Sequence, residues 1–128
     1  MSTPLSLDIA CLCADWCGTC REYAATFAAL QQALPGHRYR WIDIEDEAEL
    51  VGEVDIETFP TLLVACDGRL LFAGPVLPRL GDAQRLIEVQ QATATAALGS
   101  GRWPSLAALG VPADQAEAFT LLAQRLRG

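Results

Sequence analysis

Four of the five cysteines stand within ten positions, in the stretch CLCADWCGTC at residues 11–20. Thiols exchange disulfides and bind metals, so a cluster of this density indicates redox or metal chemistry. Cys17 and Cys20 are separated by two residues. At the start of a helix, that spacing places both thiols on one face, where a disulfide can open and close with little backbone movement.

The position of each thiol on such a helix predicts its role. Cys17, at the first turn, would face unpaired backbone N–H groups and the positive end of the helix dipole, which stabilise a thiolate. Cys20, one turn deeper on the apolar side, would be more buried and less acidic. We therefore expect Cys17 to be the nucleophile and Cys20 the resolving thiol of a disulfide exchange.

The elements that must position this pair follow from hydrophobic periodicity. Apolar residues alternate from Leu5 to Cys13, which is typical of a strand, and then recur at three- and four-residue steps until Pro35-Gly36, which is typical of an amphipathic helix. The helical stripe contains Cys20, Tyr23, Ala24, Phe27, Leu30 and Leu34. Further along, we expect a strand at 38–45, a short acidic helix at 46–54, strands at 61–66 and 69–74 joined by an Asp67-Gly68 turn, a helix capped by Asp82 and running to about Leu98, and a last helix near 112–126.

This order, βαβαββα followed by a helical tail, predicts an α/β fold. The breaker-rich segment GSGRWPS begins at residue 99. We therefore divide the 128 residues into a domain at 1–98 and a C-terminal helical extension at 99–128, packed on the domain or on a partner.

Charge and hydropathy exclude several classes of partner. The net charge is −7 and the chain has no lysine, which argues against nucleic acid and anionic membranes. No apolar run approaches the length of a membrane span, and residues 1–10 do not resemble a secretory leader. We expect a cytoplasmic protein, and in a reducing compartment a cysteine cluster is more often catalytic or metal-binding than structural.

The combination of ADWCGTC, Phe-Pro-Thr at 59–61 and the Asp-Gly hairpin resembles the thioredoxin family over about residues 5–90. The resemblance implies a three-layer sandwich around a four-stranded mixed sheet. It also implies a cis peptide bond before Pro60 and no cofactor beyond the Cys17–Cys20 disulfide. The implied partners are protein disulfide or dithiol clients and a thioredoxin-reductase-like or other thiol reductant. The implied substrate-binding residues are Trp16, Gly18, Thr19, Phe59, Pro60 and Thr61.

This sequence departs from the family pattern at several positions. Thr19 replaces the usual proline between the active cysteines, which implies a less strongly reducing pair. The buried aspartate that assists the resolving cysteine would fall on Cys11, and a neighbouring lysine on Trp41. The usual first strand and helix have no counterpart, so the 38–45 strand would lie at an exposed edge. We expect the 91–128 tail, or a second copy of the chain in a homodimer, to cover that edge.

Other interpretations remain open. Cys11 and Cys13 fit small core hydrophobes, and as auxiliary thiols they could form a second redox tier. Four thiolates could also hold zinc or an iron–sulfur cluster, but no glycine before Gly18 folds the strand back, so we predict no metal. His37 is interpreted as a surface turn residue. The alternative function is a redox-poor binding module that joins a complex through its tail.

Overall fold

The computed structural model describes residues 6–14, 18–54, 56, 59–76, 79–103, 111 and 113–127. The strands of this part of the chain are β1 (Asp8–Cys13), β2 (Arg38–Asp43), β3 (Thr61–Cys66) and β4 (Arg69–Pro75). They form one mixed sheet in the order β2-β1-β3-β4. β1 pairs in parallel with β2 and antiparallel with β3, and β3 pairs antiparallel with β4. The predicted four-stranded mixed sheet is confirmed.

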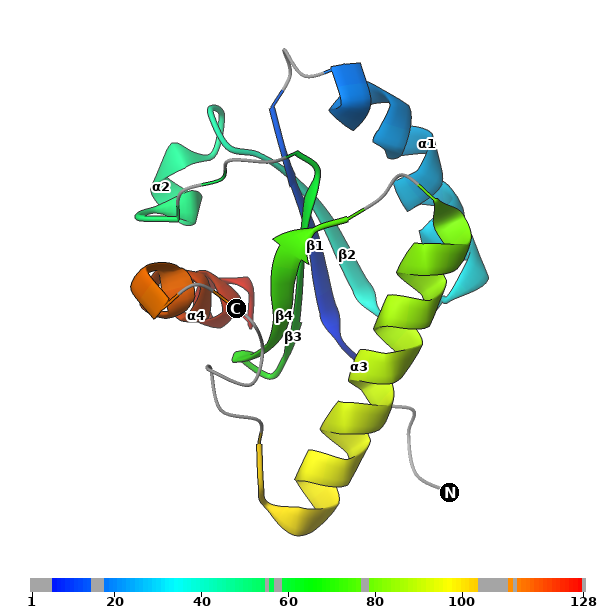
Figure 1. The fold of residues 1–128 in the computed structure, drawn as a ribbon, viewed down its shortest axis with the longest axis vertical. Helices are drawn as coiled ribbons and strands as arrows, with labels where there is room; N and C mark the ends of the chain where they lie inside the picture. Colours follow the sequence, from blue (N-terminus) through cyan, green and yellow to red (C-terminus); the bar gives the residue numbers. More distant parts are fainter. Residues whose placement is uncertain are drawn as a thin grey trace.

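The helices of the described residues are α1 (Gly18–Ala33), α2 (Ala48–Val51), α3 (Leu80–Ser100) and α4 (Ala113–Arg127). Figure 1 shows α1 and α3 on one face of the sheet, and α2 and α4 on the other. The sheet is thus the middle of three layers. Although α3 has 21 residues, no helix in the described part of the chain is both long and apolar enough to cross a membrane.

β1 is buried along its whole length because it lies inside the sheet and both of its faces are covered. Ile9, Cys11 and Cys13 enter the core beneath α1 and α3, whereas Ala10 and Leu12 enter the core beneath α4. Successive side chains of a strand point to opposite faces, so a strand between two cores must be apolar at every position. This explains the nearly continuous apolar run from residue 9 to residue 14.

The Asp67-Gly68 turn joins β3 to β4 as the sequence predicts. Asp67 has φ 50° and Gly68 has φ 81°. Positive φ at both central residues is the signature of a type I′ turn, whose twist matches that of the two strands. Asparagine, aspartate and glycine tolerate this conformation best, which is why an Asp-Gly pair between two apolar runs predicts a hairpin turn.

Several element boundaries differ from the prediction. β2 ends at Asp43 rather than residue 45, because the Asp43 carboxylate accepts hydrogen bonds from the backbone N–H groups of Glu45 and Asp46 and turns the chain. The helix expected at 46–54 is only the four residues of α2. The strand expected from Leu5 begins at Asp8.

The expected cap of α3 is wrong. The helix begins at Leu80 with Arg79 in the N-cap position, so Asp82 lies inside the first turn. There its negative charge interacts favourably with the positive end of the helix dipole. The helix then continues to Ser100 and ends at Gly101, whose N–H donates to Ala97 O at 2.7 Å. The division proposed at residue 98 therefore falls within α3, and the two-part organisation stays a prediction.

The expectation that the tail covers the edge of β2 is wrong for the residues described. β2 is the last strand on its side of the sheet, and Trp41 in it is 36% exposed. α4 packs instead on the sheet face, against β4, β1 and β3. The physical reason is that α4 has an apolar side, which carries Phe119, Leu122 and Ala123. These side chains are buried against the apolar face of the sheet, whereas the edge of β2 offers polar backbone N–H and C=O groups.

Candidate functional site

The described parts of the two segments that carry the family resemblance lie at one end of the sheet. β1 leads through the cysteine motif into α1, and β3 begins directly after Phe59-Pro60. Because β1 and β3 are antiparallel neighbours with Leu12 opposite Thr61, the residues after β1 and the residues before β3 lie at the same end (Figure 1). The fold therefore brings together positions about forty residues apart in the sequence.

Cys20 lies in the first turn of α1 and is 1% exposed, whereas Gly18 and Thr19 beside it are exposed. The first turn of α1 itself carries no acidic residue. Cys17 and Trp16 directly precede α1 in the sequence and lie outside the described residues. The predicted burial of Cys20 agrees with the structure, and the roles assigned to Cys17 and Trp16 stay predictions.

The Phe59–Pro60 peptide bond is cis, as the resemblance implies. Pro60 is buried, and its carbonyl oxygen accepts a hydrogen bond from the N–H of Val76 at 3.2 Å. Phe59 is partly buried against the core cluster that also contains Cys20. Thr61, at the start of β3, is 4% exposed. The loop is thus held between β4 and the core beneath α1.

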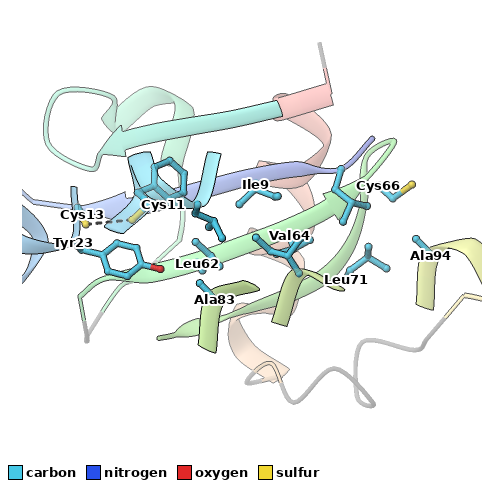
Figure 2. Packing of buried hydrophobic residues seen from close by; sticks show 14 of the residues in the cluster. Ile9, Cys11, Cys13, Tyr23, Leu62, Val64, Cys66, Leu71, Ala83 and Ala94 are labelled. Atoms are coloured by element: carbon cyan, nitrogen blue, oxygen red, sulfur yellow. Dashed lines mark hydrogen bonds between the residues drawn. The ribbon is translucent and has the colours of Figure 1, made fainter. Parts of the chain in front are cut away.

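Cys11 and Cys13 are buried side by side on β1. Their Sγ atoms lie 3.6 Å apart, within hydrogen-bonding distance for sulfur, and either thiol can be the donor (Figure 2). In the sheet register, Cys11 is opposite Trp41 of β2. The two positions at which the sequence departs from the family's aspartate and lysine are therefore neighbours across adjacent strands.

Tyr23 is a residue of this region whose importance the sequence analysis missed. Its hydroxyl group is buried and has no hydrogen-bond partner among the described residues. Burial raises the pKa of Tyr23 to about 12, and negative charge on Cys11 and Cys13 adds to the increase. The sequence did indicate its position, because Tyr23 follows Cys20 by three residues and this spacing puts both side chains on one face of a helix.

The fifth cysteine, Cys66, ends β3 in the same buried cluster. Burial raises the pKa of its thiol, and the carboxylates of Asp67 and Asp8 raise it further against the opposing effect of Arg69. A thiol in this environment resists ionisation and is a poor nucleophile. Cys66 is therefore a core residue rather than a reactive thiol.

A metal centre finds no support in the described residues, where no three histidine, cysteine, aspartate or glutamate side chains are arranged to hold an ion. Cys17, the fourth thiol of that alternative, lies outside them.

Comparison with known proteins matches the fold and the site to one family. The thioredoxin family model matches residues 8–74, more than half of the chain. A thioredoxin H-type of Oryza sativa subsp. indica is 35% identical over 55 residues, which are 43% of this chain and 45% of that protein. The protein given the name thioredoxin 2 in Streptomyces coelicolor is 30% identical over 90 residues, covering 63% of this chain and 67% of that protein.

Among solved structures, the thioredoxin of Fasciola hepatica superposes with a TM-score of 0.60 at 21% identity, covering 66% of this chain and 81% of that chain. That likeness concerns the fold. The first relative is matched over less than half of its own length. The three-layer fold with a cis-proline loop beside the first turn of α1 defines a thioredoxin-like protein. The extent of the family match shows that this chain belongs to the thioredoxin family.

Proposed function

We propose that this chain is a thiol–disulfide oxidoreductase that exchanges disulfides with protein clients through Cys17 and Cys20. The observation that carries the proposal is the position of Cys20, buried in the first turn of α1 at the sheet end where the cis Phe59–Pro60 bond also lies. Membership of the thioredoxin family supports thiol–disulfide exchange as the general activity.

In the proposed reaction the thiolate of Cys17 attacks one sulfur of a client disulfide. A mixed disulfide forms, and the other client sulfur leaves as a thiolate that takes up a proton. Cys20 then loses its proton and attacks Cys17 Sγ, which closes the Cys17–Cys20 disulfide and releases the reduced client. Two electrons pass from the dithiol to the client, and the reverse sequence oxidises a client dithiol.

The client is proposed to dock across the surface formed by the site loops. Gly18 and Thr19, which are exposed residues, together with Trp16 before them, would contact the sulfur-bearing residue. Phe59, Pro60 and Thr61 would contact the adjoining client backbone. No cofactor other than the redox-active disulfide is needed for this chemistry.

The proposed partners are protein disulfide or dithiol clients and a thioredoxin-reductase-like or other thiol reductant that recharges the pair. The acidic, lysine-free composition disfavours nucleic acid and membrane surfaces as partners. Cytoplasmic localisation and a homodimer through the edge of β2 stay predictions.

The alternative of a binding module acting through its tail loses support from the packing of α4. Phe119, Leu122 and Ala123 are each at most 5% exposed because they face the sheet of the same chain. The apolar side of this helix is therefore occupied within the molecule.

The first test measures the reduction potential of the Cys17–Cys20 pair in glutathione or dithiothreitol buffers, with the thiols mapped by mass spectrometry. We expect one reversible two-electron transition between about −180 and −270 mV. Cys17→Ser should abolish reduction of a disulfide-bonded test protein such as insulin, and Cys20→Ser should accumulate the mixed disulfide with it.

Cys66→Ala is the matched control, because it removes a buried thiol of the same cluster from outside the site. This variant should keep the transition and the activity. Failure to form a reversible Cys17–Cys20 bridge in any buffer would refute the proposed oxidoreductase activity. Loss of folding on treatment with a chelator would instead favour a metal protein.

A further inference from the structure

β2 ends the sheet on one side, and part of its backbone points away from the sheet. Arg38 N–H donates to Leu7 O at 2.8 Å, and Ile44 N–H likewise donates to a residue of β1 at 2.9 Å. Backbone groups of successive strand residues alternate in direction, so the even-numbered residues of β2 pair with β1. The N–H and C=O groups of Tyr39 and Trp41 therefore point outward, where the described residues provide no further strand (Figure 2, in which β2 is the uppermost strand).

β2 lacks the features that usually keep a sheet edge from pairing with another chain. Its residues match those of β1 one to one without a bulge, and they include neither proline nor lysine. The opposite edge of the sheet differs, because β4 ends at Pro75 and its register with β3 is irregular. Of the two edges, β2 is therefore the one suited to receive another strand.

The two faces of this edge differ in character. Tyr39 and Trp41 lie on the side of α1, where their rings contact Phe27 at centroid distances of 5.7 and 5.9 Å. Trp41 is 36% exposed, so part of a large aromatic side chain stays uncovered beside the outward backbone groups. Arg40 alternates with these residues and lies on the other face, where its Nη2 atom is 2.6 Å from Glu47 Oε1. A partner strand must therefore be aromatic on one face and tolerate a neutralised arginine on the other.

A second copy of β2 meets these requirements in one register. A two-fold axis perpendicular to the sheet makes the two strands antiparallel and keeps both α1 helices on the same side. With Arg40 of the two copies opposite each other, Tyr39 of each chain lies opposite Trp41 of the other, and each such pair exchanges both N–H···O bonds. A register shifted toward Asp43 is less favourable, because the Asp43 carbonyl oxygen already accepts the N–H of Glu47 at 2.9 Å where the chain turns.

We propose that two copies of this chain join through their β2 edges as an antiparallel pair, with Arg40 at the two-fold axis, so that their sheets become one continuous sheet. Aromatic cross-strand pairs of Tyr39 and Trp41 stabilise the α1 face. On the opposite face, each Arg40 is neutralised by the Glu47 of its own chain. This dimer goes beyond the proposed disulfide exchange and does not depend on it.

The dimer leaves both candidate sites accessible. β2 runs parallel to β1, and Asp43 lies opposite Cys13, so the candidate site is at the end of the sheet where β2 finishes. Antiparallel pairing of the two β2 strands places the two sites at opposite ends of the joined sheet. Disulfide exchange per chain should therefore be the same in the monomer and in the dimer.

The first test measures the mass of the intact protein by sedimentation equilibrium over about a hundredfold range of concentration. A phosphine reductant is present, so that intermolecular disulfides do not contribute. We expect a reversible equilibrium between one chain and two. Arg40→Glu should weaken the dimer at least about tenfold, because carboxylates then face each other across the axis beside the two Glu47 side chains.

Arg85→Glu is the matched control. It makes the same change of charge at an exposed residue of α3, a helix that packs on β3 and β4. This variant should dimerise like the natural chain. Arg40 is also exposed, so Arg40→Glu should fold, and circular dichroism checks that both variants do.

Mixing the natural chain with Arg40→Glu tests the two-fold axis directly. In a mixed dimer an arginine faces a glutamate, which is a favourable cross-strand pair. An equal mixture should therefore form the mixed dimer in preference to either symmetric one. Native mass spectrometry resolves the three species, and equal preference would contradict the position given to Arg40.

Cysteine substitutions test the register. Residues opposite each other in a non-hydrogen-bonded pair have Cα atoms about 4.5 Å apart, within the range of a disulfide. Arg40→Cys should therefore give a covalent dimer under mild oxidation. Trp41→Cys should not, because residue 41 lies opposite residue 39 of the second copy. Peptide mapping by mass spectrometry separates this bridge from any bridge between the natural cysteines.

The outcomes are distinct. A chain that stays monomeric at the highest concentration overturns the dimer, whether another segment or an extended client then covers the edge. A dimer that Arg40→Glu does not weaken overturns the β2 interface. A covalent dimer of Trp41→Cys but not of Arg40→Cys overturns the register. None of these results changes the expected redox transition of Cys17 and Cys20, so failure of this inference is distinguishable from failure of the proposed function.

Discussion

At the scale of single residues, His37 has a larger structural role than its place beside a Pro-Gly turn indicates. Its Nδ1 atom accepts a hydrogen bond from the backbone N–H of Leu7 at 3.0 Å. A ring nitrogen accepts only when it carries no proton, so this bond requires a neutral imidazole. Burial lowers the pKa of His37, against an opposing hydrogen bond with Gln91.

The lowered pKa predicts a loss of stability in mild acid. The unfolded chain binds a proton near the ordinary pKa of 6.5, and the folded chain binds it only at lower pH. The contribution of His37 is therefore complete above that value and is lost as pH falls through the folded pKa. Urea unfolding measured from about pH 7 to about pH 5 should show a declining free energy of unfolding.

His37→Asn is the matched variant, because the amide oxygen keeps an acceptor near the position of Nδ1 and does not titrate. Its decline over the same pH range should be smaller than that of the natural chain. The raised pKa of Asp8, caused first by burial, has the opposite effect in more acidic solution. Asp8 is present in both proteins and cancels in the comparison. Parallel pH profiles for the two proteins would contradict the role given to His37.

At the scale of elements, α4 tests how the tail is attached. Leu122 is fully buried against the sheet, whereas the adjacent Leu121 is 41% exposed. The two leucines have the same chemistry and helix propensity, so they differ only in what they touch. Arg125 adds a second attachment, since its Nη1 donates to the carbonyl oxygen of Leu50 in α2 at 2.9 Å.

Leu122→Ala should lower the free energy of unfolding by about 2–5 kcal/mol, because it leaves a cavity between α4 and the sheet. Leu121→Ala should change it by about 0.5 kcal/mol or less. Urea denaturation followed by circular dichroism measures both values. Equal losses in the two variants would mean that α4 does not pack on the sheet through the face described here.

Elements were predictable where one local rule decided them. The alternation around Cys11 and the helical stripe through Cys20 gave the strand and helix of the site, and Asp67-Gly68 gave the turn. Boundaries depended on competing groups, as at Asp43, whose carboxylate ends β2. The docking face of α4 was not predictable, because an amphipathic pattern identifies the apolar side of a helix and not the surface that receives it.

The same limit applied within the candidate site. Period two placed Cys11 and Cys13 on one face of a strand, and the resemblance supplied the cis bond at Pro60. The 3.6 Å contact between the two sulfurs depends on their side-chain rotamers, and the lack of a hydrogen-bond partner for the Tyr23 hydroxyl among the described residues depends on how α1 lies on β1. Such tertiary distances do not follow from spacing along the chain.

At the scale of the whole molecule, the sheet separates two cores that have different consequences for function. The core beneath α1 and α3 contains Cys11, Cys13, Cys20 and Tyr23, together with the packing of Phe59. The other core joins Ala10, Leu12 and Leu63 of the sheet to α4. The proposed redox chemistry thus lies on one side of β1, and the tail stabilises the opposite side of the same strand.

Removal of α4 is therefore expected to disable a site that α4 does not touch. A chain ending at Gly101 keeps every proposed site residue, but it exposes the sheet face that Phe119, Leu122 and Ala123 cover. We expect loss of the cooperative urea transition and association through the exposed apolar face, measured by circular dichroism and size-exclusion chromatography. Addition of a peptide of residues 111–128 should restore the transition and the reversible Cys17–Cys20 bridge together. A truncated chain that unfolds at the same urea concentration as the full chain would show that α1, α3 and the sheet are sufficient for the fold.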